Sequence, residues 1–201
     1  NGCRKNIHFA LFFKRGGAFR KIMKIYFSFF ISFLSLHFLA QTKPIDIIAY
    51  RLELKLADHT DSIYVKEHIA LNRHNSAIDT LVFDFFGPQK KGNGMTVSSV
   101  NMDGKSLSYQ QSEKKLRIRI PKRNKASELN LEIEFAGIPA DGLVISNNLH
   151  NERTFFADNW PNRAQHWYAC IDHPSEKARY EFIIEAPAKY QVVANGNLLS
   201  K

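Results

Sequence analysis

The rarest side chains of the chain gather in residues 155–180, FFADNWPNRAQHWYACIDHPSEKARY, which contain both tryptophans. His166, Cys170 and His173 have spacings of four and three residues there, and zinc accepts imidazole and thiolate ligands, with a nearby aspartate as a fourth. On a helix the three would share a face. Pro174 and the crowded aromatic residues instead favour an extended loop, in which this spacing gives no convergence. We therefore assign no metal ligand, and regard the histidines as hydrogen-bonded or at the surface and Cys170 as a small buried side chain.

The sequence contains no catalytic motif. GxSxG, a glycine-rich phosphate loop and HExxH are all missing from it. The nearest similarity is KEHIALNRH, in which Glu67 precedes His68 but the spacing to His74 is wrong for zinc. We therefore assign no catalytic residue to this chain.

The net charge of +9 suggests a phosphate-rich partner, but its distribution argues against one. Residues 1–45 contain eight basic residues and no acidic one, which leaves 20 basic against 19 acidic residues in the remainder. The body of the chain is nearly neutral, and we exclude nucleic acid as a partner.

The basic beginning of the chain is typical of an export leader. Met23 opens MKIYFSFFISFLSLHFLAQ, with Lys24 before an apolar run of about 15 residues, where a membrane-spanning helix needs about 20. We predict a signal peptide at 23–40, cleaved after Ala40, and a periplasmic or extracellular protein without membrane attachment after its removal. Residues 1–22 precede this start and are interpreted as translated upstream sequence. The exported part would carry Cys170 alone and form no internal disulfide.

Residues 41–201 have the alternation of β-strands almost throughout. Period-two patterns occur in YRLELKL from Tyr50, in residues 63–71 (Ile63, Val65, Ile69 and Leu71), in KLRIRIP and in ELNLEIEF. LVFDFF from Leu81 is more continuously apolar and is expected to be more deeply buried. YEFIIEAP and YQVVANG predict two further strands near the end of the chain.

One turn has a specific signature. Asp103 and Gly104 lie between two strand-like runs, and Asp-Gly favours a type I′ hairpin, which needs positive φ at both positions. No sustained helical period occurs. The predicted fold is all-β, an antiparallel sandwich or a saddle-like curved sheet.

Residues 45–201 resemble the N-terminal domain of the aminopeptidase N family of zinc metallopeptidases, which includes leukotriene hydrolase. The resemblance runs through YRLELKLADHTDSIYVKEHIAL and ELNLEIEFAGIPADGL, and is sharpest over residues 155–196. There, family members carry an aromatic pair, a QxEP-like segment, AR, PCFDEPxxKA and a strand ending in NG. The matching positions are Phe155, Phe156, Asp158 to Pro161, Ala164, Cys170, Asp172, Pro174, Lys177, Ala178, Asn195 and Gly196.

The chain departs from the family in QxEP, where Asp158 and Trp160 stand in place of Gln and Glu. The family glutamate helps hold the substrate's free amino terminus, so the resemblance implies that role for Asp158, the nearest carboxylate. Trp160 would form a flat apolar wall for the first side chain, and Asn159 or Arg163 would meet the peptide backbone. The alternative is that Asp158 and Asn159 only order a turn while the tryptophans pack the loop on the sheet, and for Trp167 we favour packing.

The residues after this site are interpreted as scaffold. Asp172 would hold a turn by accepting from following backbone amides, Pro174 would fix its φ, and Lys177 would supply a structural ion pair.

The resemblance implies that hydrolysis belongs to the next domain of the same polypeptide, where GxMEN and HExxH would bind zinc. We therefore expect residues 41–201 to be the N-terminal β domain of a secreted zinc aminopeptidase, truncated before its catalytic domain, acting on peptides with a free N-terminus and inactive alone. Two alternatives remain: a non-catalytic interaction scaffold of the same lineage, and a secreted carbohydrate-binding β-sandwich that stacks sugars on Trp160 and Trp167.

Overall fold

The computed structural model describes residues 43–90, 92–122 and 124–200. The expected upstream segment (1–22) and signal peptide (23–40) therefore lie outside the described residues. Within the described part, no helix has the length and apolar character needed to cross a membrane.

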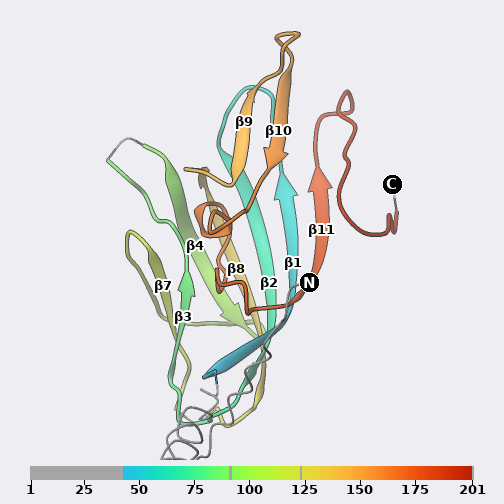
Figure 1. Ribbon diagram of the computed structural model, residues 1–201. Helices are drawn as coiled ribbons and strands as arrows, with labels where there is room; N and C mark the ends of the chain where they lie inside the picture. The colour runs from blue at the N-terminus through green and yellow to red at the C-terminus, as the bar shows by residue number, and fades with distance from the viewer. Residues whose placement is uncertain (1–42, 91, 123, 201) are drawn as a thin grey trace, which may run out of the picture. The chain divides into compact units, whose positions relative to one another are not determined.

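The largest sheet has six strands in the order β11-β1-β2-β8-β4-β5 (Figure 1). Every neighbouring pair is antiparallel except β1 and β11, which run parallel, and the long segment between these two strands gives the connection that a parallel pair needs. The predicted all-β fold is confirmed, with this one parallel pair added. The strands are β1 (Ile45–Lys55), β2 (Ile63–Arg73), β4 (Gly94–Met102), β5 (Lys105–Ser106), β8 (Glu128–Ile138) and β11 (Arg179–Glu185).

Two smaller sheets complete the fold. One has the order β3-β7-β6, made of β3 (Thr80–Asp84), β7 (Lys115–Arg119) and β6 (Tyr109–Gln111). The other is the hairpin of β9 (Leu143–Asn147) and β10 (Arg153–Ala157). Apolar side chains of the six-stranded and three-stranded sheets join in one buried cluster, so the two sheets form the layers of an open sandwich.

The period-two patterns correctly identify the buried face of each strand. Tyr50, Leu52 and Leu54 are buried on β1, as are the four apolar side chains predicted for β2 and the four predicted for β8. The hairpin turn between β4 and β5 is also confirmed, because Asp103 and Gly104 have φ values of 51° and 72°.

Two strand predictions need correction. Val82 is 39% exposed and Asp84 lies on the same outward side of β3, so LVFDFF alternates instead of being buried on both faces. YQVVANG forms no strand: no described residue pairs with it, and Val192 and Val193 are exposed. Strand propensity alone gives no strand where a hydrogen-bonding neighbour is missing.

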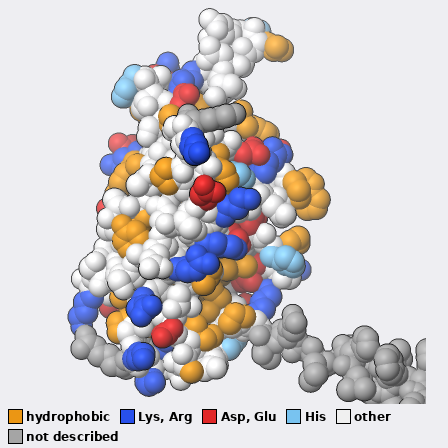
Figure 2. Space-filling model, turned by 90° about the vertical axis from the view of Figure 1, so that its left-hand side faces the viewer, with side chains coloured by type: hydrophobic (Ala, Val, Ile, Leu, Met, Phe, Trp, Pro, Cys, Tyr) orange, Lys and Arg blue, Asp and Glu red, His pale blue; other side chains and the backbone are white. Residues whose placement is uncertain are grey.

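The three-stranded sheet covers the core with one face and meets solvent with the other. Leu116 and Ile118 of β7 are buried, whereas Arg117 and Arg119 point outward and are exposed. Figure 2 looks onto this side of the molecule, the left-hand side of Figure 1, and shows Lys and Arg side chains spread across it.

Candidate functional site

The predicted substrate-contacting residues lie in one tight loop, Asp158–Arg163, which we call the lip. It leaves β10 and leads into a short 3-10 helix, η1 (Ala164–His166). The backbone N–H of Asp158 donates to the carbonyl of Gly142 (2.8 Å), and that of Arg163 donates to the carbonyl of Asn159 (3.1 Å). The Trp160–Pro161 peptide bond is cis. The lip is therefore a hydrogen-bonded turn beside the start of β9.

The Arg163 side chain holds the lip together by bonding to two of its other residues. Its Nη2 forms an ion pair with Oδ2 of Asp158, its Nε donates to the carbonyl of Trp160 (2.7 Å), and its Nη1 lies 3.5 Å from Oδ1 of Asp141. The Asp158 side chain remains 40% exposed. The carboxylate predicted to hold a substrate amine therefore already has a cationic partner, and a substrate would have to share it.

The two tryptophans have opposite environments. Trp167 is 2% exposed, packs edge-on against Tyr168 with ring centroids 4.7 Å apart, and donates from its indole N–H to Oδ1 of Asn159 (2.9 Å). Trp160 is 74% exposed at the tip of the lip. The packing interpretation is right for Trp167 and wrong for Trp160, and the paired sugar-stacking platform is not formed because only one ring is accessible.

Only glycine fits at position 142, where the backbone of Arg163 and the ring of Trp167 come close to the start of β9. Its φ is +77°, and a Cβ atom there would lie 2.2 Å from the carbonyl oxygen of Arg163 and 3.0 Å from Cδ1 of Trp167. Any side chain at this position would therefore push the lip away from β9.

The residues after the lip, Ala164–Lys177, form what we call the anchor segment, which is bonded to three strands. Cys170 exchanges backbone hydrogen bonds with Asp84 of β3 (2.7 and 3.0 Å). The N–H of Ile171 donates to the hydroxyl of Tyr50 on β1 (3.2 Å), and the N–H of Ala169 donates to Oε2 of Glu67 on β2 (3.0 Å). The scaffold role predicted for this segment is consistent with these contacts.

The individual roles within the anchor segment differ from the prediction. Asp172 accepts from the preceding N–H of Gln165 (3.2 Å), while the turn at Pro174 is closed by the His173 ring, whose Nδ1 accepts from the N–H of Ser175 (3.2 Å). Lys177 makes no ion pair with any residue that the structure describes. The sequence analysis did not identify the residue of this segment that forms an ion pair.

Glu176 supplies that ion pair. Its carboxylate lies 2.7 Å from Nζ of Lys43 and accepts from the N–H of Ile47 (2.8 Å), which ties the turn to the beginning of β1. The side chain is 4% exposed, so position 176 and not 177 carries the buried charge.

The titratable groups of the anchor segment are shifted chiefly by burial. Burial raises the pKa of Asp172 and of the Cys170 thiol, and lowers the pKa of His166. The His166 ring lies against Phe86, with ring centroids 4.4 Å apart. Across the described residues, no group of three or more His, Cys, Asp or Glu side chains could hold a metal ion, so His166, Cys170 and His173 do not fit zinc and we derive no step through a metal here.

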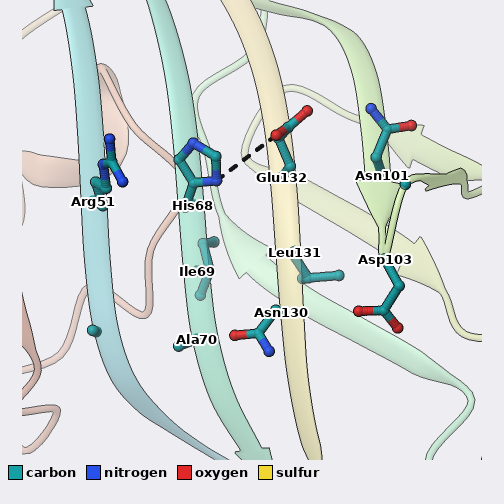
Figure 3. A pocket seen from close by; sticks show the side chains of 11 residues that line it. Arg51, His68, Ile69, Ala70, Asn101, Asp103, Asn130, Leu131 and Glu132 are labelled. Atoms are coloured by element: carbon teal, nitrogen blue, oxygen red, sulfur yellow. Dashed lines mark ion pairs between the residues drawn. The ribbon is translucent and has the colours of Figure 1, made fainter.

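A second feature lies on the outward face of the six-stranded sheet. It is a polar pocket of about 590 Å³, with the side chains of Arg51, His68 and Glu132 in one row (Figure 3). Ala49 and Ala70 leave the space beside this row. Nε2 of His68 lies 3.3 Å from Oε1 of Glu53, and Nζ of Lys66 lies 3.0 Å from Oε2 of Glu132. These polar side chains are paired across strands, and we interpret the face as a solvated network of ion pairs and hydrogen-bonding groups.

Glu67 is the buried residue that the strand pattern left out. It occupies the apolar phase of β2, between Val65 and Ile69, and is completely buried. A glutamate at an inward-facing position of the alternating pattern could have identified it from the sequence, because Asp and Glu are almost never fully buried without a partner.

The all-β fold is that of the N-terminal domain of M1 metallopeptidases, as the family model and the solved structures show. The chain belongs to the Peptidase M1 N-terminal domain family, whose sequence model matches residues 48–201. The resemblance noted in the sequence and the fold expected from it are both confirmed.

Solved structures agree with this assignment. A mutant M1 zinc metallopeptidase from Deinococcus radiodurans, bound to a Tyr-Ser-Ala substrate, is similar with a TM-score of 0.64 and 20% identity, over 79% of this chain and 36% of that one. Yeast LTA4 hydrolase in complex with bestatin is similar with a TM-score of 0.61 and 20% identity, over 74% of this chain and 24% of that one. At these identities the similarity shows the fold alone. This chain spans between about a quarter and a third of their length, and no curated protein matches it.

Proposed function

We propose that this domain forms one wall of the substrate cleft of an exported zinc aminopeptidase, with the lip holding the N-terminal end of a peptide. Hydrolysis and zinc binding belong to a catalytic domain of the same polypeptide. Membership of the M1 family supports the proposal, as does the length of the related zinc metallopeptidases, of which this domain is only a part. Export rests on the signal peptide predicted at 23–40.

The exposure of Trp160 carries the proposal. The Trp160 ring is 74% exposed on a loop whose charged side chains are held by hydrogen bonds, so it can contact a ligand or partner directly. A flat indole offers an apolar contact to the first side chain of a peptide without losing much conformational entropy. Trp160 would therefore contribute to the preference for that side chain.

Asp158 supplies charge to the same place. Its two carboxylate oxygens offer about four acceptor positions, of which Arg163 and the N–H of Trp160 (3.3 Å) occupy two. A protonated amine can take the remaining positions, and Arg163 then keeps the carboxylate in place and limits the affinity by competing for it.

An interaction scaffold of the same lineage remains the second candidate, because an exposed Trp160 would also suit a protein partner. The carbohydrate-binding alternative loses its main support, since Trp167 is buried.

The test uses the full-length protein with zinc and peptides that differ in their first residue. We expect release of the N-terminal residue, no cleavage of N-acetylated peptides, and a rise in KM of about tenfold for Trp160→Ala on substrates with a large first side chain, the factor expected for one lost apolar contact. If the zinc-loaded protein releases no amino acid, the peptidase proposal is wrong and the scaffold is favoured. If Trp160→Ala leaves KM unchanged, the lip does not contact substrate.

A further inference from the structure

Glu67 is a buried acid that the proposed cleft does not itself use. It is completely buried in the middle of β2, and its cross-strand neighbours Leu52 and Ile133 are fully buried apolar side chains. Oε2 accepts the N–H of Ala169 at 3.0 Å, whereas Oε1 has no hydrogen-bond partner among the described residues. A lone acid in such a place costs free energy, which calls for an explanation other than core packing.

The bond to Ala169 connects the core of the large sheet to the lip. Ala169 is fully buried in the anchor segment, two residues after Trp167. The indole N–H of Trp167 donates to Asn159 of the lip at 2.9 Å. A short chain of contacts therefore runs from β2 through Ala169 and Trp167 to the lip.

We propose that Glu67 is a positioning residue, which fixes the height and orientation of the lip by holding the anchor segment on β2 through the N–H of Ala169. The inference rests on the function proposed above, since it assigns Glu67 to the substrate contacts that the lip makes.

The groups around Glu67 allow it to be held neutral. Tyr50 of β1, Tyr168 and Cys170 of the anchor segment and Tyr180 of β11 are the titratable groups that face it, and burial raises the pKa of all four. No described basic side chain pairs with Glu67. Burial raises the pKa of Glu67 itself well above its ordinary value, and Oε1, which has no described partner, is the oxygen that can carry a proton while Oε2 accepts from Ala169.

Two substitutions of nearly equal volume separate positioning from packing. Glu67→Gln keeps an oxygen acceptor for the N–H of Ala169, whereas Glu67→Met fills the core with apolar atoms and removes the acceptor. If the side chain matters only for packing, Glu67→Met should match or exceed the unaltered protein in stability and in activity. If it positions the lip, Glu67→Met should raise KM and open the anchor segment locally, while β8 keeps its protection.

The experiment measures peptide hydrolysis and hydrogen exchange on the full-length protein, with Trp160→Ala as the reference. For Glu67→Met we expect KM to rise about fivefold, the factor that one lost hydrogen bond is worth, with faster amide exchange in 164–172 and unchanged exchange in β8. Glu67→Gln should behave like the unaltered protein in both measurements.

The outcomes distinguish the two proposals. If Trp160→Ala raises KM but Glu67→Met changes neither KM nor exchange in 164–172, the positioning role is wrong and the cleft stands. If Trp160→Ala has no effect on KM, the cleft is wrong, and with it the role of Glu67 in substrate binding. If Glu67→Met does not fold, Glu67→Gln serves instead: at rising pH, residues 164–172 should open before β8 in the unaltered protein but not in Glu67→Gln, and equal opening in the two proteins overturns the inference.

Discussion

The lip and the anchor segment are adjacent in sequence but differ in almost every physical respect. The anchor segment contains Trp167, Tyr168, Ala169 and Cys170, all buried, and bonds to three strands. The lip bonds mainly to itself and to the start of β9, and it exposes Trp160. The comparison shows how a surface loop, the lip, is held in one conformation by the adjacent anchor segment, which is packed in the core.

Truncating each tryptophan should give the largest contrast between the two regions. Trp167→Ala removes a buried ring and the hydrogen bond to Asn159, so we expect the free energy of unfolding to fall by about 3–5 kcal/mol. Trp160→Ala removes an exposed ring and should change it by about 0.5 kcal/mol or less. Urea unfolding followed by circular dichroism measures both. Similar losses for the two variants would mean that the lip is part of the core.

The dependence of the free energy of unfolding on pH should report on Glu67, the buried acid that holds the anchor segment. Burial raises the folded-state pKa of Glu67 above its ordinary value of 4.5, so the unfolded chain releases this proton first. The stabilising contribution is complete below about pH 4.5 and is lost as pH rises through the raised pKa, by at most about 1.4 kcal/mol per pH unit.

The matched control is Glu67→Gln, which cannot titrate. We expect the stability of this variant to lose the alkaline decline that the unaltered chain shows, when both are unfolded in urea at a series of pH values. An equal decline in the two proteins would place the titrating group elsewhere, for instance at Cys170, whose pKa burial also raises.

The local pattern of the sequence was sufficient to predict which side of β1, β2, β7 and β8 is buried, because side chains alternate in a pleated sheet whatever the strands pair with. It was not sufficient for the parallel pairing of β11 with β1, which joins residues far apart in the chain. It favoured packing for Trp167, which is buried, but left the exposure of Trp160 open. The burial of Trp167 involves close contacts with Gly142 and Asn159, which only the folded chain brings together.

Charged partners in loops were the least predictable feature. Lys177 and Glu176 are neighbours in sequence, yet of the two only Glu176 has an ion-pair partner among the described residues, and that partner is Lys43, 133 residues earlier in the chain. In the same way, Asp158 and Arg163 were each predicted to face substrate, and the fold of the lip turns them toward one another. A spacing of five residues outside regular structure has no fixed geometry from which this could be read.

The ion pair of the lip should have a small effect on stability and the most local effect on amide exchange. Arg163→Lys keeps the charge but loses the fork that binds both Asp158 and the carbonyl of Trp160, and its side chain is 31% exposed. We therefore expect a loss of about 1 kcal/mol or less in the free energy of unfolding, and faster amide exchange confined to 158–163. Arg117→Lys, on the exposed side of β7, is the control and should change neither. If amide exchange instead becomes faster across 164–172, the lip stabilises the anchor segment. That result would reverse the argument from Glu67, in which the anchor segment positions the lip.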